Sequence, residues 1–161
     1  MTSDMLLQLF ERGEASWLGQ LIRLSLWLFP VIETVHLLGL CILGGAVLLV
    51  DLRLFGLGLR SQPLAVVARG AQPWLYVGVG VMLTTGFLLA LSEAVKCFHN
   101  PSFWVKMITL PFALLFTFAV RQRWAVRSPL MGPWKRGLLA TVSLGLWFTV
   151  AMAGRWIGFS S

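Results

Sequence analysis

The chain has 161 residues, of which 58% are hydrophobic and 12% charged, whereas a soluble globular domain is about 25% charged. So small a polar fraction excludes an ordinary water-exposed surface, and the length fits one domain, residues 1–161, whose main solvent is lipid. The net charge of +7 does not indicate nucleic acid, because the basic residues lie in short loops between apolar segments.

The segment 16–29 is expected to form an amphipathic helix on the membrane surface. Ser16, Gln20 and Arg23 recur at helical spacing and make one narrow polar stripe on an otherwise apolar segment. Pro30 is expected to end this helix, because proline disfavours helical conformation in the residue before it. The alternative, a helix packed across the mouth of a bundle, places the segment on the same side of the membrane.

Four further segments are long and apolar enough to cross a hydrocarbon core of ~30 Å, which takes about 20 helical residues. They are residues 31–50, 74–91, 103–120 and 138–157. Each must be helical, because a segment in lipid has to satisfy its own backbone hydrogen bonds. The predicted fold is therefore an all-α integral membrane four-helix bundle preceded by an N-terminal interfacial helix.

The basic residues predict the orientation of the bundle. Eight of the thirteen Lys and Arg residues fall on the side of the loops near residues 51–73 and 121–137, together with Asp51 as the one acidic residue. Because positively charged loops stay in the cytoplasm, that side is expected to be cytoplasmic, and both termini periplasmic in a bacterial inner membrane. These loop charges are expected to form a solvated surface, with Asp51 capping a helix or pairing with Arg53.

Ionisable residues gather at the opposite, outer end of the predicted spans. A charge near the bilayer centre costs about 2.5–3.5 kcal/mol, so such groups are rare and usually have partners. Antiparallel spans bring groups from all four helices to one level, around a helix boundary at which Asn100 is suited to cap and Pro101 to begin the third span. The groups are Glu33, His36, Glu93, Lys96, Cys97, His99, Lys106 and Arg155. They could bind a ligand, or they could simply pair with one another.

His36 is the strongest candidate ligand in this cluster. A neutral imidazole is the commonest protein ligand for a metal or haem, and its second nitrogen needs a hydrogen-bond partner. Glu33 lies three residues earlier on the same helix face and could supply that partner. His99 is the candidate second ligand. The alternatives are a hydrogen-bonded packing role for His36 and a solvent-facing position for His99.

The segments Pro30–Gly39, Asp51–Gly56, Ser92–Pro101 and Gly154–Ile157 together resemble a family of small bacterial inner-membrane proteins whose function is uncharacterised. The resemblance covers nearly the whole chain and implies a bacterial four-span protein, with no activity to transfer. Its motif positions here are Glu33, His36, Asp51, Arg53, Glu93, Lys96, His99, Asn100 and Arg155. More loosely, a four-helix membrane bundle with histidines near one leaflet is similar to b-type cytochromes and membrane copper-handling proteins.

The first functional hypothesis is a haem b protein that transfers electrons between a membrane partner and a periplasmic redox protein. His36 and His99 would bind the iron, while Lys96, Lys106 and Arg155 would pair with the propionates. Gly39, about one turn below His36, would leave room for the edge of the porphyrin. Two copies of His36 in a homodimer could also share one haem.

The second hypothesis is a non-redox membrane binder or carrier that uses the same outer cluster. A small anion would suit the three basic residues of that cluster, and copper would suit soft or borderline ligands such as His36, Cys41, Cys97 and Met152. The copper would come from or pass to a metal-carrying protein. An enzyme that uses the Glu33–His36 or Glu93–Lys96 pair for acid–base chemistry is a weaker third hypothesis, because no nucleophile is evident.

Overall fold

The computed structural model describes residues 3–127 and 132–159. Within them, four helices are long and apolar enough to cross a membrane, which confirms the predicted helical membrane bundle. They are α3 (Leu28–Phe55), α4 (Leu64–Ser92), the segment Pro101–Val126 and α8 (Pro133–Ile157). The third comprises α6 (Pro101–Leu115), the π-helix η1 (Phe116–Arg121) and most of α7 (Gln122–Arg127).

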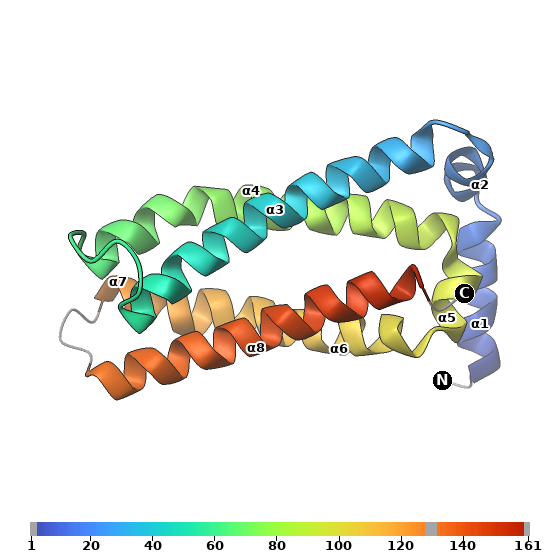
Figure 1. Cartoon of the computed structure of the whole chain (residues 1–161). Helices are drawn as coiled ribbons and strands as arrows, with labels where there is room; N and C mark the ends of the chain where they lie inside the picture. Colours follow the sequence, from blue (N-terminus) through green and yellow to red (C-terminus); the bar gives the residue numbers. More distant parts are fainter. Residues whose placement is uncertain (1–2, 128–131, 160–161) are drawn as a thin grey trace.

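The long helices form two layers, α3 with α4 and α6 with α8 (Figure 1). Helix α1 (Ser3–Glu14) lies across one end of the bundle, next to α2 (Trp17–Leu24) and α5 (Ala94–His99). The α3–α4 loop and α7 lie at the other end. We call these the α1 end and the α7 end. The outer cluster predicted from the sequence belongs to the α1 end.

Helices α3 and α4 approach closely at two glycines. A Cβ on Gly39 would lie 2.7 Å from Cγ1 of Val81, and a Cβ on Gly78 would lie 2.9 Å from the backbone Cα of Leu43. Small residues allow such backbone approach in lipid, where there is little hydrophobic drive to bring helices together. This contact fixes the rotation of α3 against α4, and hence which side chains of each helix face the bundle interior.

The N-terminal segment differs from the prediction. Residues 16–29 do not form one helix, because α2 ends at Leu24 and α3 already begins at Leu28. The Ser25 hydroxyl accepts hydrogen bonds from the backbone N–H groups of Trp27 and Leu28, so it competes with helix continuation. Pro30 lies in the first turn of α3, where its missing N–H costs nothing, and ends no helix. The short helices α1 and α5 were not predicted.

The spans are also longer than the apolar segments indicated. Helix α4 begins at Leu64 and continues through Pro73, and α8 begins at Pro133. Polar residues and a proline near the membrane surface suggested a loop, but neighbouring helices can satisfy a backbone that a proline interrupts. The predicted start of α6 is confirmed, since the Asn100 side chain accepts a hydrogen bond from Ser102 N at 2.9 Å and Pro101 follows. The loop residues 128–131 lie outside the described part of the chain.

Candidate functional site

His36 faces the bundle interior and is held by α4. Its Nδ1 lies 2.7 Å from Oγ1 of Thr85, and that hydroxyl donates its own proton to the Val81 carbonyl oxygen at 2.6 Å. Because the hydroxyl has one proton and has already donated it, Nδ1 must carry the proton and Nε2 must hold the lone pair. A Cβ on Gly86 would lie 3.2 Å from Cε1 of the imidazole, so Gly86 makes the space that the ring occupies.

The partner of His36 is therefore Thr85 and not the predicted Glu33. Glu33 is exposed, although it lies only one turn from His36 on the same helix. A short hydroxyl on the facing helix reaches the imidazole because Gly86, in the same turn of α4 as Thr85, lets the ring approach. The consequence is a neutral hydrogen bond that orients the ring and leaves Nε2 available.

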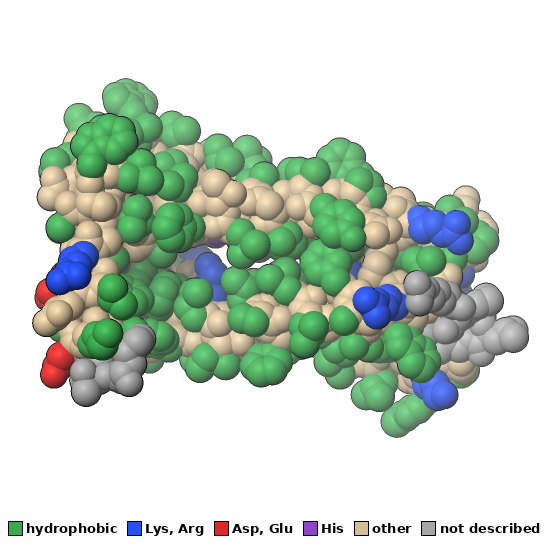
Figure 2. Space-filling model, turned by 180° about the vertical axis from the view of Figure 1, so that it is seen from behind, with side chains coloured by type: hydrophobic (Ala, Val, Ile, Leu, Met, Phe, Trp, Pro, Cys, Tyr) green, Lys and Arg blue, Asp and Glu red, His purple; other side chains and the backbone are tan. Residues whose placement is uncertain are grey.

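Lys106 also extends into the interior, from α6. Its side chain lies near both His36 and Cys97 and passes Gly154 of α8, where a Cβ would lie 3.4 Å from Nζ. Among the described residues, no carboxylate lies within ion-pair distance of its Nζ. Figure 2 shows this side of the molecule hollowed between the two helix layers towards the α1 end, with basic side-chain atoms inside the hollow. A cation without an acidic partner here favours an anionic ligand.

The other predicted charges lie at the periphery. Lys96 and Glu93 form a loose ion pair of 3.9 Å at the surface of the α1 end. Arg155 is exposed, with its guanidinium carbon 4.5 Å from the centre of the Phe159 ring. The structure thus brings His36 and Lys106 together in the interior, and leaves Glu93, Lys96 and Arg155 at the rim.

His99 and Gly39 differ from their predicted roles. His99 ends α5, is exposed, and packs edge-on against Phe98 with ring centres 5.2 Å apart. Thr85 lies seven residues before the end of α4, so the His36 ring lies about 10 Å deeper along the bundle than that helix end, at 1.5 Å per residue. Val81 fills the space beside Gly39, so this space cannot hold the porphyrin edge predicted there.

The candidate copper ligands are spread over the bundle surface and interior. Cys41 and Met152 are exposed, while Cys97 is buried in α5. In residues 3–127 and 132–159, no three His, Cys, Asp or Glu side chains gather closely enough to hold a metal ion. Burial, with the nearby Glu93 carboxylate, raises the pKa of the Cys97 thiol to about 11, so this thiol is an unreactive neutral group at physiological pH.

Glu14 organises the end of the bundle above this interior. One of its carboxylate oxygens pairs with Arg23 of α2, and the other accepts a hydrogen bond of 2.8 Å from the backbone N–H of Val95. Because the first N–H groups of a helix lack internal acceptors, the carboxylate caps α5. One α1 side chain therefore ties α1, α2 and α5 together.

A second polar centre lies at the α7 end and is fully buried. Arg121 Nη1 donates to Asp51 Oδ1 at 2.8 Å and to the Val47 carbonyl oxygen at 3.2 Å. The other carboxylate oxygen of Asp51, Oδ2, accepts a hydrogen bond of 2.7 Å from the Ser143 hydroxyl. Arg121 and Asp51 are both 0% exposed. Nε and Nη2 of Arg121 are buried without a hydrogen-bond partner among the described residues. The network connects α3, η1 and α8, and it replaces the predicted pairing of Asp51 with Arg53.

The model of a family of unknown function, DUF6644, matches residues 9–160. The chain belongs to this family. The match covers both polar centres and all four long helices, and it confirms the predicted membership of an uncharacterised family. No curated protein and no solved structure matches the chain.

In this DUF6644 member, the sequence predicts surface positions for Asp51 and Arg121, which the structure places together in the buried interior. Asp51 is the one acidic residue at an otherwise basic end, and Arg121 directly follows an apolar segment. The sequence predicts that Arg121 belongs to a solvated basic surface and that Asp51 caps a helix or pairs with Arg53, and neither prediction places the two side chains together. The π-helix η1 widens the turn that leads to Arg121, and local widening of this kind is often found at functional sites. Neither the widening nor the inward direction of the guanidinium is encoded in the composition of the segment.

Proposed function

We propose that this protein is a haem b-binding electron-transfer subunit of the bacterial inner membrane, with its site at the periplasmic side and His36 as an axial ligand. The observation that carries the proposal is the hydrogen bond from His36 Nδ1 to Thr85, which leaves Nε2 with an unshared lone pair in the bundle interior. A histidine oriented through its second nitrogen is the usual form of a metal-ligating imidazole.

Lys106 supports the same proposal from the charge side. Haem b carries two propionates, and a lysine without an acidic partner in a low-dielectric interior favours such an anion. The lysine comes from α6, in the layer opposite His36, so a flat group between the layers would contact both. When bound, the haem supplies the one-electron chemistry, and the chain's residues supply ligation and electrostatics.

His99 remains the candidate second ligand, but it would have to leave its packing against Phe98 and move into the bundle. Gly39 has no part in the proposed site, because Val81 fills the space beside it. Two copies of His36 in a homodimer are the alternative source of two axial imidazoles.

The test is an absorption spectrum of the protein purified in detergent after haemin reconstitution, with and without dithionite. We expect a Soret band and a sharp α-band that disappear in His36→Ala. Thr34→Ala is the matched control on the same helix, since Thr34 is exposed and its hydroxyl donates to the Pro30 carbonyl oxygen of its own helix. Bands that persist in His36→Ala, or a wild-type protein that stays colourless, would overturn the proposal.

Two further variants separate the roles of the other residues. Lys106→Met is expected to lower the midpoint potential, because loss of a nearby positive charge destabilises the reduced, more negative haem. His99→Ala is expected to convert a low-spin spectrum to a high-spin one if His99 is the second ligand. An unchanged low-spin spectrum would assign that position to His36 of a second copy or to another residue.

The second candidate function is a non-redox binder or carrier of a small anion, with copper as its metal variant. Among the described residues Lys106 has no carboxylate partner, and a small anion alone would be enough to neutralise its charge. Titration calorimetry with inorganic phosphate, and metal analysis of the purified protein, address these two ligands. Phosphate binding that is lost in Lys106→Met but kept in His36→Ala would support this function over the haem.

A further inference from the structure

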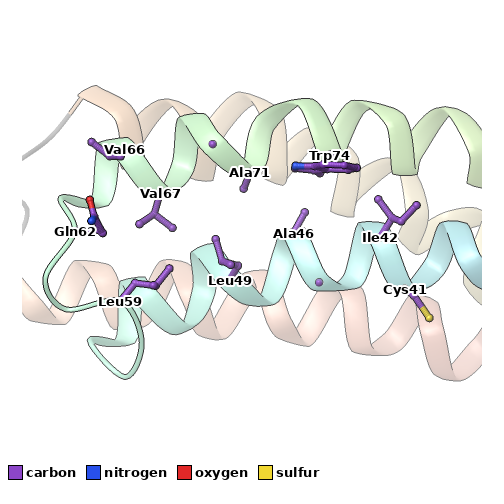
Figure 3. Close-up of a pocket in the computed structure, with 12 residues that line it drawn as sticks. Cys41, Ile42, Ala46, Leu49, Leu59, Gln62, Val66, Val67, Ala71 and Trp74 are labelled. Atoms are coloured by element: carbon purple, nitrogen blue, oxygen red, sulfur yellow. The ribbon is translucent and has the colours of Figure 1, made fainter.

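An apolar groove runs between α3 and α4 on the membrane-facing surface, towards the α7 end. Its volume is about 530 Å³, and its walls include Leu49 from α3, Val67 and Trp74 from α4, and Leu59 from the loop. In Figure 3, Leu49 and Val67 point into the space between the two helices. The groove exists because Gly45 and Gly70 have no side chains to fill it, and a Cβ on either would meet no atom within 4 Å.

The length of the groove fits an extended hydrocarbon chain. The α3 wall runs from Cys41 to Leu49, which is about 12 Å at 1.5 Å per residue and close to half of a hydrocarbon core of ~30 Å. At its loop end the groove adjoins Arg53, and this positive charge favours a lipid over a second helix as the occupant.

The mouth of the groove carries positive charge without matching negative charge. Arg53 Nε donates to the carbonyl oxygen of Gln62, a residue of the groove wall, at 2.9 Å, and Arg60 Nε donates to the Gly56 carbonyl oxygen. Among the described residues, neither arginine forms an ion pair, and the nearby Asp51 is buried against Arg121. Two guanidinium groups at a membrane surface match a phosphate in geometry and charge.

We propose that this groove is a binding site for an anionic phospholipid, with one acyl chain between α3 and α4 and the phosphate at Arg53 and Arg60. The apolar walls contact the chain, and the loop arginines distinguish an anionic headgroup from a zwitterionic one, because a zwitterion carries its own cation. The lipid belongs to the leaflet at the α7 end. The site is separate from His36 and Lys106, so it does not depend on the proposed haem.

The first experiment tests the chain-binding part by native mass spectrometry of the detergent-purified protein. Phosphatidylglycerol and phosphatidylcholine with identical acyl chains are titrated onto wild type, Gly70→Phe and Gly80→Phe. Both glycines lie on α4 and have open space at Cβ, but only Gly70 lines the groove. We expect wild type to bind phosphatidylglycerol at least tenfold more tightly than phosphatidylcholine. Gly70→Phe should lose this tight phosphatidylglycerol binding, and Gly80→Phe should keep it. Thermal melting of each variant checks that it is folded.

The second experiment tests the proposed headgroup contacts with a double variant, Arg53→Gln and Arg60→Gln. Lys135→Gln is the control, since Lys135 is exposed at the start of α8 and lies outside the groove. The double variant is expected to bind both lipids equally, and the control to keep the preference. Equal binding of the two lipids by wild type, or undiminished phosphatidylglycerol binding by folded Gly70→Phe, would overturn the proposal. A wild-type dimer that Gly70→Phe converts to monomer without lipid loss would assign the groove to a second copy and also overturn it.

Discussion

Replacement of Asp51 by leucine is expected to be among the most destabilising single changes in this protein. The carboxylate is completely buried and accepts bonds from the Arg121 guanidinium and the Ser143 hydroxyl, at 2.8 and 2.7 Å. Among the described residues, its removal leaves the Arg121 charge with the Val47 carbonyl oxygen and the Ser143 hydroxyl as its acceptors. A buried charge that loses its counter-ion destabilises a fold much more than the loss of one neutral hydrogen bond.

The magnitude follows from these contacts. Each hydrogen bond to a charged group contributes about 1.5–3 kcal/mol, and two are lost, which amounts to about 3–6 kcal/mol. The range measured for other broken buried pairs is about 3–5 kcal/mol, and we expect Asp51→Leu to fall within it. Arg121→Met should cost a similar amount, since it leaves the carboxylate unpaired. The double variant should recover most of this loss, because two apolar side chains leave no buried charge.

The assay is equilibrium unfolding in mixed detergent micelles, followed by helical circular dichroism, for both single variants and the double variant. Arg53→Met is the control, because this arginine has no carboxylate partner among the described residues and should cost less than about 1 kcal/mol. If the two single effects simply add in the double variant, or if Asp51→Leu costs less than the control, the pair does not stabilise the bundle and the reasoning fails.

Three further predictions concern the packing, the imidazole and the thiol. Gly78→Ala should destabilise the bundle by about 1–3 kcal/mol in the same unfolding assay, because its Cβ would meet the α3 backbone. Gly80→Ala should stabilise the bundle by up to about 1 kcal/mol, because the space at its Cβ is open and alanine favours a helix more than glycine does. Thr85→Val should remove the acceptor of the His36 Nδ1 proton and let both imidazole tautomers coexist, as nitrogen NMR of labelled histidine would record. Alkylation of Cys97 should accelerate about tenfold per pH unit until the pH approaches its raised pKa of about 11, because only the thiolate reacts.

Each of these predictions has an outcome that contradicts it. Equal stability changes at the two glycines would mean that the close α3–α4 approach does not constrain position 78. A single, unchanged tautomer in Thr85→Val would assign the orientation of His36 to another group. A Cys97 alkylation rate that levels off near pH 9, measured in a variant whose other cysteine is replaced by serine, would show an ordinary thiol without a burial effect.

The membrane architecture of this protein was predictable from its sequence. Each span is a continuous apolar segment, and the thickness of the bilayer acts on every such segment by itself, so hydropathy and length are sufficient. The start of the third span was also local information, since Asn100 and Pro101 satisfy a helix N-terminus without any distant contact. The break between α2 and α3 was missed because Ser25 was treated as one position of a helical pattern and not as a competing cap.

The side-chain partners were decided only by the tertiary structure. These helices are apolar on nearly every face, so the sequence does not encode which face of each helix turns inward. Close contacts at Gly39 and Gly78 set the rotation of α3. That rotation turns His36 towards Thr85, 49 residues away in the chain. It also turns Asp51 towards Arg121, 70 residues away. Which polar groups face one another in a bilayer therefore depends on the close packing of small residues between helices, and a single span carries no record of it.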